Sequence, residues 1–194
     1  MKLAVRRPSS IKLAAIATLP LFVSCGATDM PDRPPEVPPG EITAAELGAA
    51  TYVSRHLAEG RVTLRDARYE DRERGIVVSL LPEYAVGDLN GDGLPDAAVL
   101  LATSMGGSGV FQDLAVVLAT PDSEPRNIAS VFLGDREPVD RIRIENGEIA
   151  LELLAHGPGD PMCCPTLAVT RRFRLVDGHI EPSGESGLAP DPDT

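Results

Sequence analysis

The sequence is poor in basic and aromatic residues, and each shortage argues against a class of function. Lys and Arg together number 18 against 29 Asp and Glu, which gives a formal net charge of −11. Nucleic-acid binding requires clustered Lys and Arg that neutralise phosphates, so this balance argues against a nucleic-acid partner. Tryptophan is absent and only 4% of the residues are aromatic, which also disfavours a base-stacking surface for single strands.

The N-terminal part lacks an apolar run of membrane-spanning length. Its apolar stretch, residues 13–23, is shorter than the roughly 20 residues that a membrane-spanning helix needs. Small Ser24 follows this stretch. Four basic residues precede the stretch or lie at its start: Lys2, Arg6, Arg7 and Lys12. This order of positive charge, apolar core and small residue predicts that residues 1–24 form a secretory signal peptide.

The residues around the predicted cleavage site resemble a bacterial lipobox. Leu-Phe-Val-Ser ends directly before Cys25, and Gly26 follows it. The resemblance implies that Cys25 is lipidated on sulfur and becomes the mature N-terminus, although the pattern prefers Leu at Phe22. Gly26 rather than Asp implies sorting to the outer membrane, facing the periplasm. The alternative is a plain signal peptide cut nearby, which leaves Cys25 an ordinary free cysteine.

Removal of residues 1–24 makes the remaining chain more acidic. Both lysines and two arginines lie in that segment, so 14 basic residues remain against 29 acidic ones, a net charge of about −15. A domain of this charge is repelled by anionic headgroups. We therefore expect the N-terminal lipid, rather than a basic patch, to attach the protein to the membrane.

The rest of the chain divides into a tether, one domain and a tail. Residues 25–41 are rich in proline and predict an extended tether. Residues 181–194 are rich in Pro, Gly and acidic residues and predict a disordered acidic tail. The remaining residues, 42–180, are predicted to form a single β-rich domain.

The domain is predicted to be α+β and mostly β. Thr43 and Glu46 have capping-box spacing and predict a helix that runs to about Leu57 or Ala58. Asn146-Gly147 indicates the turn of a β-hairpin. The segments predicted as strands are 61–65, 75–81, 97–103, 114–119, 127–133, the hairpin 141–154, and 168–176. Because no strand–helix–strand rhythm is present, we expect an antiparallel sheet or partly open barrel of about seven strands with one N-terminal helix.

Residues 88–96 carry oxygen-bearing side chains at alternate positions of a glycine-containing loop. Asp88, Asn90, Asp92 and Asp96 occupy positions 1, 3, 5 and 9, and Leu94 would add its backbone carbonyl at position 7. Calcium prefers six to eight oxygen ligands, which this spacing can gather. The pattern predicts a structural calcium site. The alternative is an acidic turn in which the Asp and Asn side chains bond to their own backbone.

The loop also carries a family resemblance. Position 12 is Val99 rather than Glu, so the loop is not an EF-hand. It resembles the DxNxDGxxD loop of FG-GAP/VCBS-type β proteins, which leads into a strand. Together with segments 106–109, 131–136 and 156–166, it makes the sequence similar to a family of uncharacterised bacterial envelope lipoproteins. That resemblance covers roughly two thirds of the mature chain and implies a β-rich envelope domain without catalytic residues to assign.

Cys163 and Cys164 are neighbours in a loop that also contains His156 and Asp160. Free thiols rarely persist in an oxidising compartment, so a disulfide between the two cysteines is one prediction. Buried free thiols are the second interpretation. A metal or redox site with His156 is the third, although zinc ligands usually stand two to four residues apart.

The sequence therefore predicts a lipid-anchored, non-catalytic binding or structural module of the cell envelope. One alternative is an inhibitor or adaptor that binds an envelope enzyme through an exposed loop, residues 105–111 or 156–166. The other is a hydrolase or redox enzyme that uses His156, Cys163 and Cys164. The sequence has no nucleophile-elbow pattern, and its glycine-rich segment 106–109 lacks the Lys-Ser/Thr of a P-loop, which disfavours the enzyme.

Overall fold

The computed structural model describes residues 42–121 and 124–187. They belong to one compact unit, Val37–Thr194. The predictions for residues 1–41 and 188–194 therefore lie outside the described residues. The elements are α1 (Ala44–Ala49), β1 (Thr51–Val53), β2 (Arg61–Thr63), β3 (Arg68–Asp71), β4 (Ile76–Gly87), β5 (Asp96–Met105), β6 (Phe111–Leu118), β7 (Arg126–Asp135), β8 (Val139–Glu145), β9 (Glu148–Ala155), β10 (Leu167–Val176) and β11 (His179–Gly187).

The capping box starts α1 as predicted, but the helix is much shorter than expected. The Thr43 hydroxyl accepts a hydrogen bond from the Glu46 backbone N–H at 3.2 Å, and the Thr43 N–H donates to the Glu46 carboxylate at 2.8 Å. Ala49 ends the helix because the β-branched and aromatic residues of β1 pair with β2 instead. The prediction of a helix to Leu57 or Ala58 was wrong.

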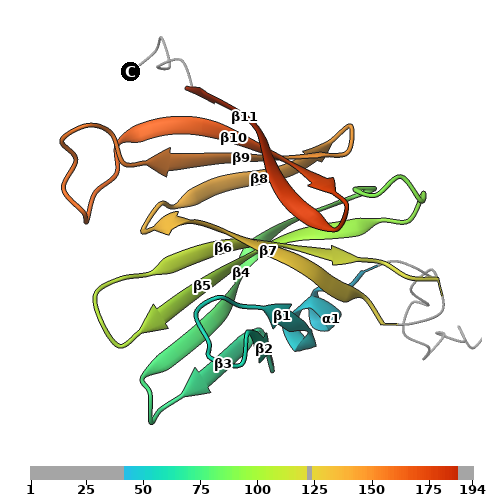
Figure 1. Cartoon of the computed structure of the whole chain (residues 1–194), viewed down its shortest axis with the longest axis horizontal. Helices are drawn as coiled ribbons and strands as arrows, with labels where there is room; N and C mark the ends of the chain where they lie inside the picture. Colours follow the sequence, from blue (N-terminus) through green and yellow to red (C-terminus); the bar gives the residue numbers. More distant parts are fainter. Residues whose placement is uncertain (1–41, 122–123, 188–194) are drawn as a thin grey trace, which may run out of the picture. The chain divides into compact units, whose positions relative to one another are not determined.

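The eleven strands form three open antiparallel sheets (Figure 1). The five-stranded sheet has the order β3-β4-β5-β6-β7, the four-stranded sheet has the order β11-β10-β9-β8, and β1 pairs with β2. Neighbours in sequence are thus neighbours in each sheet, as short turns favour. The expectation of an antiparallel, mostly β fold is confirmed. The described residues form no closed barrel, and their strands outnumber the seven expected.

Strand β11 includes seven residues that the sequence assigned to a disordered tail. It pairs with β10 from Val176↔His179 to Val169↔Gly187, and it thereby carries the ordered structure past residue 180. Eight of its nine residues are exposed, with Ile180 the exception. Its order comes from backbone pairing with β10, which leaves no apolar pattern to read in the sequence.

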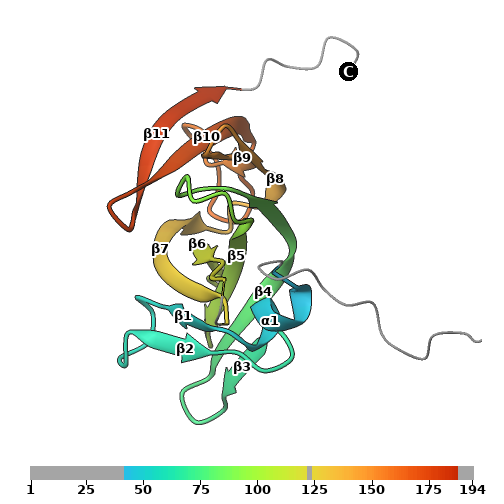
Figure 2. The same ribbon diagram turned by 90° about the vertical axis from the view of Figure 1, so that its right-hand side faces the viewer.

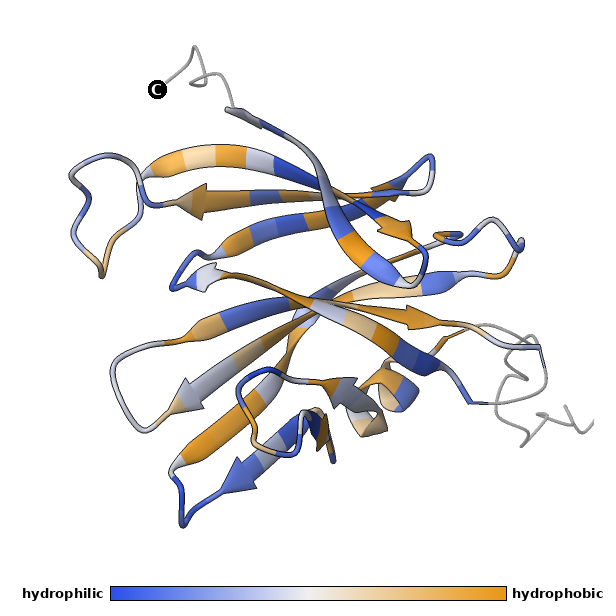
Figure 3. Cartoon of the chain, viewed as in Figure 1, coloured by the Kyte–Doolittle hydropathy of each residue, from blue (hydrophilic) through white to orange (hydrophobic). Residues whose placement is uncertain are grey.

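Two apolar clusters lie on opposite faces of the five-stranded sheet. Figure 2 shows α1, β1 and β2 on one side of this sheet and strands β8–β11 on the other. One is shared with the four-stranded sheet and includes Leu100, Leu114 and Leu151. The other is shared with α1, β1 and β2 and includes Val99 and Tyr52. Strands β5 and β6 are consequently buried on both faces, which explains the unbroken apolar runs 97–102 and 114–118 within them. Figure 3 shows hydrophobic stretches on strands of both large sheets.

The two large sheets approach each other closely where β4 meets β8. A Cβ atom added to Gly87 would lie 2.7 Å from Ile144 Cγ2, so only glycine fits at this contact.

Among the residues that the structure describes, no helix has the length and hydropathy required to cross a membrane.

Candidate functional site

Three connections lie together at one end of the large sheets. They are residues 106–110 between β5 and β6, 136–138 between β7 and β8, and 156–166 between β9 and β10, and we call them the loop end (Figure 1). Two of these three connections, 106–110 and 156–166, fall within the loops that were predicted from the sequence to bind a partner. The structure thus places residues 105–111 and 156–166 at the same end of the domain.

Asp135 and the two residues after it join these connections. Arg136 has a positive φ of 57°, which turns the chain sharply after β7. The Asp135 carboxylate accepts a hydrogen bond from the Val110 N–H at 2.8 Å, and the Arg136 N–H donates to the Val110 carbonyl at 2.8 Å. On the other side, His156 Nε2 lies 3.4 Å from the Asp135 carbonyl oxygen. The Asp135–Glu137 corner therefore contacts both loops.

Charged side chains tie this corner to the four-stranded sheet. Arg171 on β10 donates to Glu137 at 2.6 Å and to Glu185 on β11 at 2.7 Å. It also donates to the Leu133 carbonyl at 3.2 Å. Glu137 is only 9% exposed, so its carboxylate requires such partners. Arg171 thus connects β10 both to the β7–β8 connection and to β11.

The corner also contains polar atoms that its neighbours do not satisfy. Within the described residues, three buried atoms here have no hydrogen-bond partner: Gln112 Oε1, Arg136 Nε and His156 Nδ1. Gln112 pairs in register with Gly134, directly before the corner. Buried polar atoms in proteins are nearly always paired, so three unpaired atoms at one corner are unusual.

The Cys loop is held at its base by one carboxylate. Asp160 accepts hydrogen bonds from the backbone N–H groups of Gly157 and Thr166, both at 2.8 Å, and from the Thr166 hydroxyl. These backbone N–H groups hold the pKa of Asp160 below its usual range. At the tip, Cys163 and Cys164 are exposed and joined by a disulfide. The interpretation as buried free thiols is therefore wrong for this structure.

Exposed hydrophobic side chains concentrate at the loop end. Eight large hydrophobic residues of the described chain are exposed. Four of them lie in these connections or directly flank them, namely Met105, Val110, Met162 and Leu167. A fifth, Phe132, lies 6.3 Å from the ring of Phe111, the first residue of β6. A gathering of apolar side chains on a surface is typical of an interaction site.

A groove lies beside Phe132, between β7 and the β10–β11 hairpin. It has a volume of about 410 Å³, and Phe132, Phe173 and Pro182 contribute apolar walls. Arg171, paired with Glu137 and Glu185, lies along the same groove. The groove extends the apolar surface of the loop end toward β11.

A histidine–carboxylate pair connects the N-terminal layer to β6 below this surface. His56 Nε2 lies 2.8 Å from Asp113 Oδ2, with the two side chains 10% and 6% exposed. The His56 ring stacks on Phe111 at 5.3 Å and meets the edge of Phe132 at 5.9 Å. Burial raises the pKa of Asp113, and the neighbouring His56 opposes that rise. No sequence pattern predicted this pair, because its members are 57 residues apart.

The Asp-rich loop lies between β4 and β5, at the opposite end of β5 from residues 106–110. Three of its predicted ligands bond to backbone N–H groups inside the loop, as in Asx-type turns. These bonds are Asp88 with Gly91 and Gly93 at 2.7 and 3.0 Å, Asn90 with Asp92 at 2.9 Å, and Asp92 with Leu94 at 2.8 Å. The loop is thus organised by its own side chains.

Asp96 is the buried member of the set. It is 0% exposed and accepts hydrogen bonds from the N–H groups of Leu89 at 2.9 Å and Ala119 at 3.0 Å. Burial raises the pKa of Asp96, and the nearby charges of Asp92 and Asp88 add to the rise despite these two bonds. A cation at this position would offset three negative charges at once.

The side chains of the loop are suitable calcium ligands, but the described conformation does not bring them together. Asp88, Asp92 and Asp96 supply carboxylates. An ionised carboxylate has about four acceptor sites, and Asp88 uses two of them for the Gly91 and Gly93 N–H groups. Across residues 42–121 and 124–187, however, no three His, Cys, Asp or Glu side chains are arranged to hold a metal ion. The described conformation is an acidic turn, and calcium binding would require the three carboxylates to converge.

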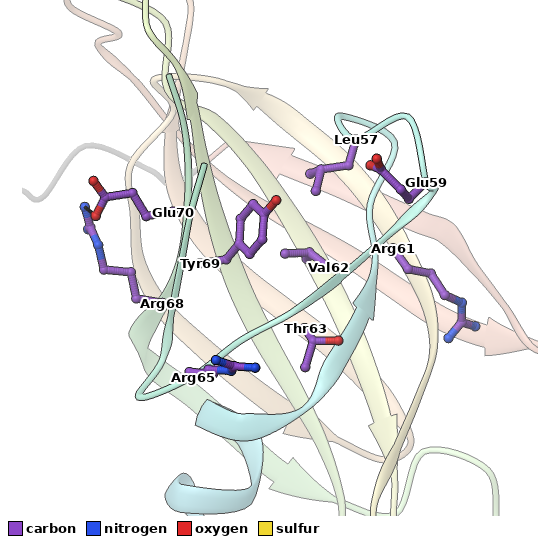
Figure 4. Close-up of a pocket in the computed structure, with 9 residues that line it drawn as sticks. All are labelled: Leu57, Glu59, Arg61, Val62, Thr63, Arg65, Arg68, Tyr69 and Glu70. Atoms are coloured by element: carbon purple, nitrogen blue, oxygen red, sulfur yellow. Dashed lines mark ion pairs between the residues drawn. The ribbon is translucent and has the colours of Figure 1, made fainter. Parts of the chain in front are cut away.

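A hollow of mixed polarity lies elsewhere in the outer layer, between β2 and β3. Figure 4 shows Tyr69 and Val62 in its middle, with Arg61 on one side and the Arg68–Glu70 ion pair on the other. Its volume is about 610 Å³. The Arg68 and Glu70 charged groups are 3.7 Å apart and exposed, and such surface pairs contribute little. None of the residues predicted to be functional lines this hollow.

Compared with protein-family models, with curated proteins and with solved structures, the chain matches none of them. The loop end, the histidine–carboxylate pair and the Asp-rich loop are therefore the features on which a functional proposal depends.

Replacement of His56 by Ala is expected to destabilise the domain by about 3–5 kcal/mol, because it leaves the buried Asp113 carboxylate without its partner. Urea unfolding measures the change. His179→Ala is the matched control, since His179 is exposed at the start of β11, and it should cost less than about 0.5 kcal/mol. Equal effects of the two substitutions would show that the His56–Asp113 pair does not stabilise the fold.

Proposed function

We propose that this protein is a non-catalytic binding module of the bacterial cell envelope, attached by a lipid on Cys25, and that it binds a protein partner through the loop end. The observation that carries the proposal is the concentration of exposed hydrophobic side chains there. Met162 is the most exposed of these, at 61%, and lies next to the disulfide at the loop tip. Apolar side chains surrounded by polar ones are typical of protein interfaces.

The envelope location rests on the sequence. Positive charge, an apolar core, a small residue and Cys25 follow one another in the order of a lipoprotein signal. The resemblance to envelope lipoproteins with an FG-GAP/VCBS-like loop agrees with this location. We place the mature protein at the outer membrane, facing the periplasm, with the acidic domain kept from anionic headgroups by its charge.

A binding role fits the chemistry of the candidate residues better than catalysis does. In the described structure Cys163 and Cys164 share a disulfide, so neither presents the free thiolate that nucleophilic catalysis requires. The His156 ring lies against the Asp135 carbonyl, and the His56 ring is bonded to Asp113 and packed on Phe111. Both histidines are thus engaged in contacts that organise the loop end.

An inhibitor or adaptor of an envelope enzyme is the second candidate. The observation that favours it is the form of the Cys loop. Met162 stands at a turn between Pro161 and Cys164, closed by a 2.9 Å hydrogen bond, and Pro165 follows. A fixed, protruding apolar residue suits insertion into a concave site at little entropic cost.

We also propose that the Asp-rich loop binds a structural calcium ion. The support is the set of three carboxylates and one amide within nine residues, and the raised pKa of the buried Asp96. The loop lies away from the loop end, so the ion would stabilise the β4–β5 connection rather than contact a partner. An affinity of about 10⁻⁴–10⁻³ M is expected for a site of this extracellular type.

Crosslinked pull-down of the lipid-anchored protein from membranes tests the binding proposal. Met162→Asp should reduce capture of a specific partner about tenfold, the loss that about 1.4 kcal/mol produces. Val86→Asp is the matched control, because Val86 is exposed on β4 away from the loop end, and it should leave capture unchanged. Capture of no protein, or equal capture by both variants, would contradict the proposal.

The intact mass of the protein extracted from membranes tests the lipid anchor. It should show lipid on Cys25, and an unmodified Cys25 would refute the anchor.

Calorimetric titration with calcium tests the Asp-rich loop. The protein should release or absorb heat on binding, and calcium at ten times its Kd should raise the free energy of unfolding by about 1.4 kcal/mol. Asp88→Ala/Asp92→Ala should abolish both effects. Glu73→Ala/Glu83→Ala removes the same charge from exposed positions outside the loop and should preserve them. No heat, or undiminished heat in the Asp88/Asp92 variant, would leave the acidic turn as the correct interpretation.

A further inference from the structure

The Cys163–Cys164 disulfide joins adjacent residues, and this makes it unlike a structural staple. A disulfide stabilises a fold mainly by constraining the unfolded chain, and its effect grows with the length of the loop that it closes. Here the two cysteines are adjacent in sequence, so the bond closes no loop of chain. Stabilisation of the domain is therefore a poor explanation for the bond.

The loop that carries the disulfide is fixed by other interactions. Asp160 accepts from the Gly157 and Thr166 backbone N–H groups at 2.8 Å each and from the Thr166 hydroxyl at 3.0 Å. The Cys164 N–H donates to the Pro161 carbonyl at 2.9 Å. None of these bonds uses a sulfur atom. Opening the disulfide therefore breaks none of these hydrogen bonds directly.

Both cysteines are accessible from solvent. Each is exposed, and Pro161, Met162 and Thr166 around them are exposed as well. Their Cα atoms are 3.8 Å apart, as in any neighbouring pair, whereas ordinary disulfides join Cα atoms 4.4–6.8 Å apart. Exposed disulfides outside the ordinary geometry are those that thiols reduce most readily.

From these contacts we propose that Cys163–Cys164 is a thiol-exchange site, at which an external thiol opens the disulfide while the domain stays folded. The proposal does not depend on the partner proposed for the loop end. The chemistry is the same whether the thiol belongs to a small molecule or to a Cys-X-X-Cys protein, and the two sources are separate arms of the test.

The exchange proceeds in two balanced steps. The thiolate of the first thiol attacks one cysteine sulfur, the S–S bond breaks, and a mixed disulfide forms while the other cysteine leaves as a thiolate and takes a proton from water. The second external thiol, as its thiolate, attacks the sulfur of the first external thiol in the mixed disulfide. This releases the second cysteine, which is protonated in turn. The disulfide gains two electrons and two protons, and the two external thiols are oxidised to one disulfide.

Reduction of the folded protein tests the proposal. Cysteamine and a reduced Cys-X-X-Cys protein are the probes, and iodoacetamide after each time point counts the thiols by mass. Because access is not limiting at an exposed bond, the rate with cysteamine in buffer should lie within about threefold of its rate in urea. Two carbamidomethyl groups should appear on the peptide with Cys163 and Cys164, without loss of the folded circular-dichroism signal. The arm that reacts faster at equal thiolate concentration identifies the source of the thiol.

Cys163→Ser/Cys164→Ser is the control for the role of the bond. Its melting temperature should stay within about 2 °C of the parent, because the bond closes no loop. Three results would overturn the proposal. Reduction could be slowed more than about 100-fold by folding and occur only on unfolding. Iodoacetamide could label both cysteines before any reductant is added. The Ser variant could melt far below the parent, which would make the bond structural.

Discussion

The two-sided burial of β5 and β6 is the constraint on which the rest of the structure depends. Ala97 to Leu101 and Leu114 to Val117 are 0–2% exposed, so neither face of these strands can meet water. One face is covered by the four-stranded sheet and the other by α1, β1 and β2. Strands β3 and β11 lie at the edges of their sheets, away from this doubly covered centre, which is why they can be so polar.

This central pair of strands also explains where charged groups are buried. Asp96 begins β5 and Asp113 lies near the start of β6, and both are drawn into the interior by the strands that carry them. Each is satisfied differently: Asp96 by two backbone N–H groups, and Asp113 by His56. Burial raises the pKa of both carboxyls. Asp96 thus supports the Asp-rich loop, and Asp113 supports the loop end at the other end of these strands.

Local sequence signals predicted the parts of the fold that are decided locally. The apolar runs after Asp96 and Asp113 and the turn at Asn146-Gly147 each specify their own strands. The signals failed where a distant partner decides the structure. Residues 51–53 leave the predicted helix because β2 pairs with them, and residues 181–187 are ordered because β10 does. The Asp135–Glu137 corner and the His56–Asp113 pair form only when segments far apart in sequence meet. Local patterns carry no trace of such contacts.

Amide hydrogen exchange tests most directly whether β5 and β6 are the centre of the fold. The amides of residues 97–101 and 114–117 should exchange only through global unfolding, with the largest free energies of opening in the domain. Residues 106–110 and 156–166 should exchange through smaller local openings, and β11 should open before β9. Exchange from β5 and β6 that is as fast as exchange from β11 would contradict the account, because the strands buried on both faces would then not be the last to open.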